Sequence, residues 1–541
     1  MPADSPSSFE LLQGLLHPPP ARSTRLQRLL PTSGTLANLN ESARQGHRLL
    51  LPVLTGLRSL AQVIFINNPI SGALLLLAFL LESPWMAVLA VFGTAGANLT
   101  SRGFQLSRGL RHQGIHGFNG ALVGCAAAVL VRSRSLADAA LWLVLVLMGS
   151  AATTVLLEAW GRRFHGRGAL PPLTFPFCVV TWVLLAMGGA LPLAPTDSGP
   201  LVSSSWPLEP LQALLLGLPR SFGQVFLCST LGSGLLVLLA VALASPLAAA
   251  LGLFGAFTAM VMALLLEASN ASVAQGLWGY NGVLVAIALG GIFHAPTRRS
   301  LLLALGGAAL TAPGSMLMLA VLPGLPALTL DFVLTTWMLK LLAGRTLPAL
   351  MPVCVHAVLT PEEHRERYRV ARHALSTFRT NLRHRHTKGS AAPIAPPMAE
   401  PLRQTIGLLF DQLDADRDGS LSLAELRAAL TNGALASNTA LSQLDIVVEA
   451  MDVDGDGRVD RTEFTALIER LQRLRDAESR LLLYLMPADA DGDDRLDPVE
   501  LGRLLRSIDV PALTAAEEER VFGISRSALT WRGFVDCLLL T

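Results

Sequence analysis

Residues 117–123 read Gly-Phe-Asn-Gly-Ala-Leu-Val, and residues 279–285, which lie 162 positions later, read Gly-Tyr-Asn-Gly-Val-Leu-Val. The same offset aligns further identities, namely Arg58 with Arg220, Gln62 with Gln224, Ser71 with Ser233 and Pro84 with Pro246. After a slip of seven residues, Leu-Pro-Pro-Leu-Thr at 170–174 falls on Leu-Pro-Ala-Leu-Thr at 325–329. Self-similarity at a fixed period indicates a duplicated structural unit, so we expect one fold built from homologous halves at about 50–200 and 212–355.

The composition indicates that these halves lie in a membrane. The 541-residue chain is 51% hydrophobic and 15% charged, whereas soluble domains carry about 25% charged residues. Only seven of its 40 acidic residues fall between Leu49 and Leu359, and 26 follow Pro401. A bilayer core about 30 Å thick needs roughly 20 apolar residues per helix. Long, nearly charge-free segments occur at 63–81, 83–101, 139–157, 169–196, 221–266, 271–297 and 300–330. The sequence therefore predicts an all-α polytopic membrane protein followed by a soluble domain.

Composition also divides the chain into a polar tail (1–48), a membrane domain (49–359), a basic, Pro-rich linker (360–400) and an acidic domain (401–541). The arginines of the linker place that end of the membrane domain in the cytoplasm by the positive-inside rule, so we expect both termini there. The same basic cluster either binds anionic headgroups of the membrane lipid or only sets the topology.

The remaining bulk properties exclude two classes of function. A net charge of +2 gives no reason to expect a nucleic acid partner. The sequence has no nucleophile paired with a base and no Cys/His cluster with metal-ligand spacing, so we expect no enzyme activity.

The polar residues of the membrane domain are the candidates for the lining of a transport path. Helix-breaking or polar motifs recur at matching positions of the two halves, where duplicated transporters build their sites. No charged residue repeats inside the apolar segments, although a path for ions is expected to contain one. We therefore expect a neutral solute. An amide without partners costs about 4–8 kcal/mol to dehydrate, so an amide solute needs carbonyl and hydroxyl oxygens along its path.

Four motifs of the membrane domain closely resemble the signatures of the urea transporter family, namely residues 67–72 (Asn-Asn-Pro-Ile-Ser-Gly), 114–120, 170–177 and 276–285. The resemblance covers about residues 50–355. It implies inverted halves of five spans each plus a half-membrane re-entrant helix, that is, about ten transmembrane helices and two re-entrant helices. It also implies one pore in each protomer of a homotrimer.

The resemblance also implies the residues of the pore. The polar selectivity positions fall on Gln62, Gln224, Thr174 and Thr329. The flat slot that holds planar urea falls on Phe65, Phe118 and Leu122 in one half and on Leu227, Tyr280 and Leu284 in the other. This sequence departs from the family pattern at Leu227, where Phe65 predicts an aromatic residue, at 229–231, at His116 and at Asp331. Asp331 either caps a broken helix or adds a charge to the pore.

The acidic domain contains loops with the spacing of calcium ligands. Calcium prefers six to eight oxygens, which a twelve-residue loop supplies from positions 1, 3, 5, 7, 9 and 12, with Gly at 6. Three stretches match this spacing and resemble EF-hands: Asp414, Asp416, Asp418, Ser420, Ser422 and Glu425; Asp452, Asp454, Asp456, Arg458, Asp460 and Glu463; and Asp489, Asp491, Asp493, Arg495, Asp497 and Glu500. The third loop has Asp494 in place of the glycine. Since EF-hands pair, residues 522–533 are the candidate for a metal-free fourth hand, with Leu529 at its apolar eighth position.

Together these patterns predict a passive, channel-like urea transporter of the cell (plasma or inner) membrane, with a cytoplasmic domain that binds calcium and modulates the flux. Two alternatives stay open. The path conducts another small neutral solute, such as water, ammonia or a short amide, or the chain is a membrane-anchored calcium-binding protein whose calcium sites do not act on transport.

Overall fold

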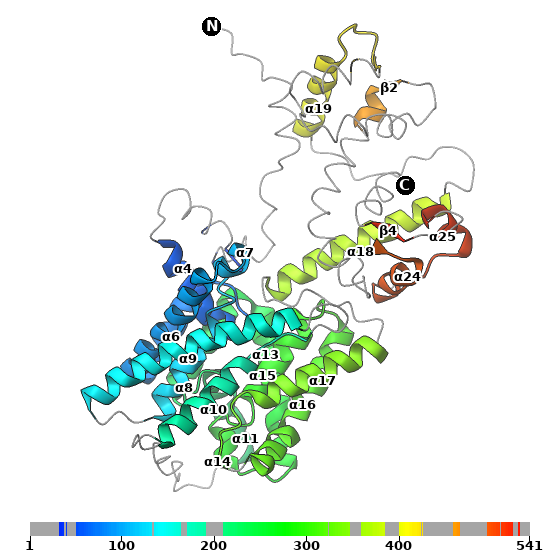
Figure 1. The fold of residues 1–541 in the computed structure, drawn as a ribbon. Coiled ribbons are helices and arrows are strands. Elements are labelled where there is room, and N and C mark those ends of the chain that lie inside the picture. The colour runs from blue at the N-terminus through cyan, green and yellow to red at the C-terminus, as the bar shows by residue number, and fades with distance from the viewer. Residues whose placement is uncertain are drawn as a thin grey trace.

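The computed structural model is largely helical and describes residues 32–36, 39, 50–131, 135–163, 170–190, 209–322, 324–346, 359–384, 400–422, 425, 458–465, 495–508, 510–522 and 528–530. The helices between Leu50 and Thr346 pack against one another in one bundle (Figure 1).

The two halves form the same series of helices. The first half forms α4 (Leu50–Gln62), α5 (Pro69–Glu82), α6 (Pro84–Gly103), α7 (Arg108–His112), α8 (Phe118–Leu130), α9 (Leu136–Arg163) and α10 (Phe175–Ala190). The second forms α11 (Pro210–Gln224), α12 (Leu231–Ala244), α13 (Pro246–Leu265), α14 (Asn270–Ala274), α15 (Tyr280–Ile287), the π-helix η1 (Ala288–Ile292), α16 (Arg298–Val321) and α17 (Leu330–Thr346). Helices α5 and α12 both have 14 residues, and α6 and α13 both have 20. The predicted duplication is confirmed.

The duplication extends to unusual backbone angles. Phe65 and Leu227 both have a φ of 62°, and Leu173 and Leu328 both have a φ of 50°. A left-handed conformation is uncommon for bulky side chains. Its repetition at aligned positions shows that both halves make the same tight turns directly after α4 and α11 and directly before α10 and α17.

The same sequence features start the helices of both halves. The side chain of Asn68 accepts hydrogen bonds from the N–H groups of Ile70 and Ser71, and Pro69 occupies the first position of α5. In the second half the side chain of Thr230 caps α12, and Ser245 caps α13 ahead of Pro246. A capping oxygen satisfies N–H groups that have no partner within the helix, and proline at the first position loses no hydrogen bond.

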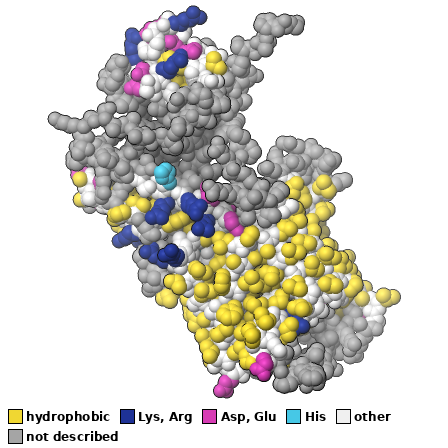
Figure 2. All heavy atoms as spheres, turned by 180° about the vertical axis from the view of Figure 1, so that it is seen from behind, with side chains coloured by type: hydrophobic (Ala, Val, Ile, Leu, Met, Phe, Trp, Pro, Cys, Tyr) yellow, Lys and Arg dark blue, Asp and Glu magenta, His cyan; other side chains and the backbone are white. Residues whose placement is uncertain are grey.

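The composition of the helical surface agrees with a membrane environment. Three helices are long and apolar enough to cross a bilayer, Leu136–Arg163, Pro246–Leu265 and Arg298–Val321, and five shorter apolar helices accompany them among the described residues. Hydrophobic side chains cover most of the visible face of the bundle, whereas Lys and Arg gather toward one end of it (Figure 2). The chain is thus an all-α polytopic membrane protein, and the number of ten spans stays a prediction.

Two segments outside the expected membrane domain pack against it. Residues 32–36 of the polar tail pack against the bundle, with Ser33 and Thr35 buried. The first part of the expected linker forms α18 (Pro361–His384), which contacts α13 and η1 and extends away from the bundle in Figure 1. The tail and the linker are therefore not simple flanking segments.

The described part of the soluble domain consists of short elements. These are α19 (Glu400–Leu413), α24 (Pro498–Ser507), α25 (Ala515–Phe522) and the strands β1 (Ser420–Leu421), β2 (Val459–Asp460), β3 (Arg495–Leu496) and β4 (Leu529–Thr530). Strand β1 pairs antiparallel with β2, and β3 pairs antiparallel with β4.

Candidate pore and calcium sites

Two threonines meet where the halves come together. The Oγ1 atoms of Thr174 and Thr329 lie 2.6 Å apart, and both side chains are buried. Each threonine directly precedes a helix, α10 or α17, and lies at the end of a Leu-Pro-X-Leu-Thr segment. The segments that the repeat predicts to be equivalent thus contact each other through the same atom.

Two tryptophans hold these segments in place. Trp182 Nε1 on α10 donates to the carbonyl of Pro326 over 2.9 Å, and Trp337 Nε1 on α17 donates to the carbonyl of Pro171 over 2.8 Å. Each half therefore fixes the proline segment of the other. The exchange is reciprocal, so neither segment can shift without breaking a hydrogen bond to the opposite half.

Thr174 lies on the lining of a cavity. The cavity is lined by Gln62, Val63, Phe65, Ile115, Phe118, Leu157, Pro171, Pro172, Leu173, Thr174, Phe293 and Phe332. Four of the predicted pore residues, Gln62, Phe65, Phe118 and Thr174, lie on this lining. The ring of Phe65 makes edge contacts with Phe293 and Phe332, at 5.9 Å between ring centroids in both cases.

The other predicted pore residues occupy related places. Gln62 Nε2 donates to the carbonyl of Gln113 over 2.9 Å, and Gln224 Nε2 donates to the carbonyl of Gln275 over 3.1 Å. The hydroxyl of Tyr280 donates to the carbonyl of Leu328 over 2.6 Å. Leu122 on α8 and Leu284 on α15 are fully buried in the core, and Leu227 is half-buried at the turn after α11.

Phe293 and Phe332 line the cavity and are not among the pore residues predicted from the sequence. Both come from the second half and close a cavity whose other lining residues belong to the first half. The repeat aligns each residue with its counterpart and carries no information on contacts between the halves, so no signal in the sequence pointed to them.

Asp331 connects three helices. Its carboxylate accepts hydrogen bonds from Ser315 on α16 (2.9 Å), Thr335 on α17 (3.4 Å) and Asn281 on α15 (3.5 Å). These partners are side chains, not the backbone N–H groups of a helix cap, and Asp331 is not on the lining of the cavity. The other departure, His116, is also buried and has Nε2 3.2 Å from Glu158 Oε1.

We predict that Asp331→Ala destabilises the protein by about 1–3 kcal/mol, because it leaves buried donors without an acceptor. Asp331→Asn, which keeps one acceptor oxygen, is expected to lose less. Thermal unfolding of the detergent-solubilised protein tests this, with the exposed acid variant Glu267→Ala as the control. Equal unfolding midpoints for Asp331→Ala and Glu267→Ala would contradict the role of Asp331 in connecting the three helices through hydrogen bonds.

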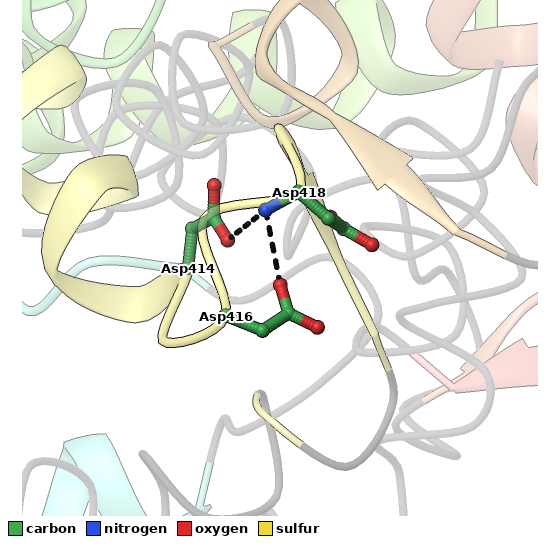
Figure 3. A group of neighbouring side chains, drawn as sticks. All are labelled: Asp414, Asp416 and Asp418. Carbon is green, nitrogen blue, oxygen red and sulfur yellow. Dashed lines mark hydrogen bonds between the residues drawn. The ribbon is translucent and has the colours of Figure 1, made fainter.

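The first calcium loop brings its acids together. One carboxylate oxygen from each of Asp414, Asp416 and Asp418 lies within 4.8 Å of the others. In Figure 3, the N–H group of Asp418 donates to the carboxylates of Asp414 and Asp416, over 3.2 and 3.1 Å, so the loop folds around them. Gly419 at the sixth position has a φ of +86°, which explains the glycine at this place.

The last ligand position is held close to the start of the loop. Glu425 accepts hydrogen bonds from the N–H group of Ala415 (2.9 Å) and from the N–H and hydroxyl groups of Ser422 (2.9 and 2.8 Å). The hydrogen bonds from Ser422 lower the pKa of the Glu425 carboxyl, and those from Ser420 lower the pKa of Asp418. Both groups therefore stay ionised at mildly acidic pH. The donor set consists of hard, ionised oxygens and fits Ca²⁺.

The strand registers pair the loops. Leu421 of the first loop lies opposite Val459 of the second, and both occupy the eighth position. Leu496 of the third loop lies opposite Leu529, which is the arrangement that the alignment of a fourth hand predicts. Of the second and third loops the structure describes Arg458, Asp460, Glu463, Arg495, Asp497 and Glu500. The remaining predicted ligands, Asp452, Asp454, Asp456, Asp489, Asp491 and Asp493, lie outside the described residues.

Comparison with known proteins identifies the family of each of the two domains. A family model for urea transporters matches residues 53–344, and one for an EF-hand domain pair matches residues 403–469. Urea transporter 1 of Ovis aries is 32% identical over 317 residues, which are 57% of this chain and 81% of that protein. Urea transporter 1 of Rattus norvegicus is 31% identical over 318 residues, with the same coverage. Calcium-dependent protein kinase 31 of Arabidopsis thaliana is 36% identical over 84 residues, which are 15% of this chain and 17% of the kinase. With more than half of its length matched, the chain belongs to the urea transporter family and carries a C-terminal EF-hand pair.

Proposed function

We propose that the protein conducts urea passively across the cell membrane. The observation that carries this proposal is the contact between Thr174, which lines a cavity with mostly apolar walls, and Thr329 of the other half. A urea molecule that leaves water loses hydrogen bonds to both N–H₂ groups and to its carbonyl. Hydroxyl oxygens at the junction of the halves accept N–H groups where the apolar side chains offer no partner.

The proposed path is lined by both halves. The flat rings of Phe65, Phe118 and Phe332 bound the cavity and favour a planar solute, while Gln62 and Thr174 supply polar atoms. We propose that Leu122 completes the slot with Phe65 and Phe118. The equivalent side of the path is formed by Gln224, Leu227, Tyr280, Leu284 and Thr329. One such path in each protomer of a homotrimer is the assembly that we propose for the membrane.

Shrinkage of proteoliposomes in a urea gradient, followed by stopped-flow light scattering, tests the proposal. We expect urea flux well above that of empty liposomes, and a strong reduction in the double variant Gln62→Ala, Thr174→Ala. Flux no faster than in empty liposomes would contradict urea conduction. Repeating the assay with ammonia, water or acetamide decides whether another small neutral solute is preferred.

We further propose that the soluble domain binds calcium through the three predicted ligand sets and modulates the flux from the cytoplasm. The convergence of Asp414, Asp416 and Asp418 supports the first site, and the pairing of β1 with β2 and of β3 with β4 supports two pairs of hands. A membrane-anchored calcium-binding protein without an effect on transport is the alternative.

The comparison of calcium with a chelator distinguishes these possibilities. We predict that wild-type urea permeability in proteoliposomes differs between saturating calcium and EGTA, and that the difference disappears in the double variant Asp414→Ala, Asp452→Ala. If calcium and EGTA give the same permeability in the wild type, the domain serves to bind calcium without acting on transport.

A further inference from the structure

The buried tail segment Thr32–Leu36 joins three parts of the protein. Asn68 Nδ2 of the first half donates to the carbonyls of Thr32 and Gly34, each over 2.8 Å. The N–H group of Gly34 donates to the carbonyl of Ala244 in the second half over 2.9 Å. Thr35 donates through N–H and Oγ1 to Glu363 of α18, over 3.3 and 3.1 Å. The segment therefore bridges the two halves and is hydrogen-bonded to α18, the helix that precedes the soluble domain.

From this segment a series of hydrogen bonds runs to the cavity. Arg58, which is fully buried, donates from Nη1 to the carbonyl of Thr35 (2.7 Å) and to Oδ1 of Asn67 (2.8 Å). Asn67 Nδ2 contacts Gln113 Oε1 over 2.5 Å, and the carbonyl of Gln113 accepts from Nε2 of Gln62. The contacts are continuous from Glu363 through Thr35, Arg58, Asn67 and Gln113 to Gln62. We name these six residues the Glu363–Gln62 relay.

The equivalent turn of the second half is built differently. There Ser229 and Thr230 replace the two asparagines, and Glu82 accepts hydrogen bonds from the N–H and hydroxyl groups of both, over 2.7–3.1 Å. Glu82 aligns with Ala244, which has no acceptor side chain. On the face of α18 the acids come from α18 itself. Glu362 accepts from Ser245 Oγ and from the N–H group of Leu247, and Glu363 holds the tail segment.

The first turn of α18 also packs against η1, which directly precedes a residue of the cavity wall. A Cβ atom on Gly291 of η1 would lie 2.7 Å from the Pro361 ring, so proline and π-helix are in close contact. Phe293, which directly follows η1, lines the cavity and contacts Phe65. Both the polar relay and this apolar contact lead from the first turn of α18 to the same cavity.

We infer that Glu363 and Thr35 are positioning residues for Gln62, so that the selectivity of the pore depends on how α18 is seated on the bundle. This inference rests on the proposed urea path and assigns the tail and the linker a part in it. When a network that joins two sites through packed side chains is interrupted, the coupling between the sites changes by about 2- to 30-fold. Such changes are large enough to alter the ratio at which two related solutes pass.

The ratio of urea to methylurea permeability, measured with the full-length protein in proteoliposomes, tests the inference. We expect Glu363→Ala and Asn67→Leu to change this ratio by about threefold or more. Glu363→Gln keeps an acceptor for Thr35 and is expected to stay near the wild-type ratio. The control Glu366→Ala removes an exposed acid of the same helix and should leave the ratio unchanged.

The ratio separates positioning from a folding defect, because fewer intact channels lower both permeabilities by the same factor. If Glu363→Ala does not fold, the milder Thr35→Val variant decides, and we expect it to change the ratio by a smaller factor. A wild-type ratio in Glu363→Ala, or in Thr35→Val where that variant decides, would overturn the inference while wild-type urea flux remains. Absence of urea flux in the wild type would instead remove the proposed function itself.

Discussion

Proteoliposomes that contain the double variant Thr174→Val, Thr329→Val should pass urea about 10- to 100-fold more slowly than those with the wild-type protein. Valine has nearly the shape of threonine, so the path stays open while two hydroxyl oxygens are lost. A buried group without a hydrogen-bond partner costs about 1–3 kcal/mol, and 1.4 kcal/mol corresponds to a tenfold change in rate or binding. Stopped-flow light scattering in a urea gradient measures the effect.

The same helices offer a matched control. Thr181 on α10 and Thr336 on α17 also align between the halves, and their buried hydroxyls have no hydrogen-bond partner among the described residues. The double variant Thr181→Val, Thr336→Val therefore removes the same atoms without removing a hydrogen bond, and we expect urea flux close to that of the wild type. Equal flux in the two double variants would show that the hydroxyls of Thr174 and Thr329 do not serve the passage of urea.

The second large effect concerns calcium. Asp414→Ala together with Asp452→Ala removes the first ligand from both loops of the first pair, and we expect the affinity of that pair to fall by about 100-fold or more, because affinity in such loops follows the number of charged ligands. Isothermal titration calorimetry of the full-length protein in detergent measures this as a loss of the tight-binding sites. The third loop should keep its site.

A neighbouring acid provides the control for calcium binding. Asp411 on α19 lies just before the first loop and forms an ion pair with Arg461, outside the ligand positions. Asp411→Ala changes the charge of the region by the same amount as the loss of one ligand, and we expect it to leave the number of tight sites unchanged. A similar loss of affinity in Asp411→Ala would mean that general negative charge, not ligand geometry, holds the calcium.

The features that the sequence predicted well are those with a fixed local spacing. The twelve-residue loop encodes its own geometry, so the convergence of Asp414, Asp416 and Asp418 followed from position alone. The duplication likewise followed from a constant offset, and it correctly placed Thr174 and Thr329 in equivalent segments.

Contacts between distant parts of the chain were not predictable in this way. Phe293 and Phe332 have no periodic pattern that directs them to a cavity in the other half. Residues 32–36 look like part of a polar tail, and their place is set by Arg58 and Glu363, which are distant in sequence. Asp331 was expected to cap a helix or to line the pore, and its actual partners, Ser315 and Asn281, belong to other helices.

The difference in side chain between the turns after α4 and α11 has a consequence for the kinetics of the proposed path. Phe65 and Leu227 share the same backbone conformation in the two halves and differ in side chain, so in the path that we propose the two ends are unequal. A passive path obeys detailed balance, and unequal ends therefore cannot drive net transport in either direction. They do allow the concentration at which urea saturates the path to differ between the two sides, so inward and outward flux can have different half-saturation values while the equilibrium stays the same.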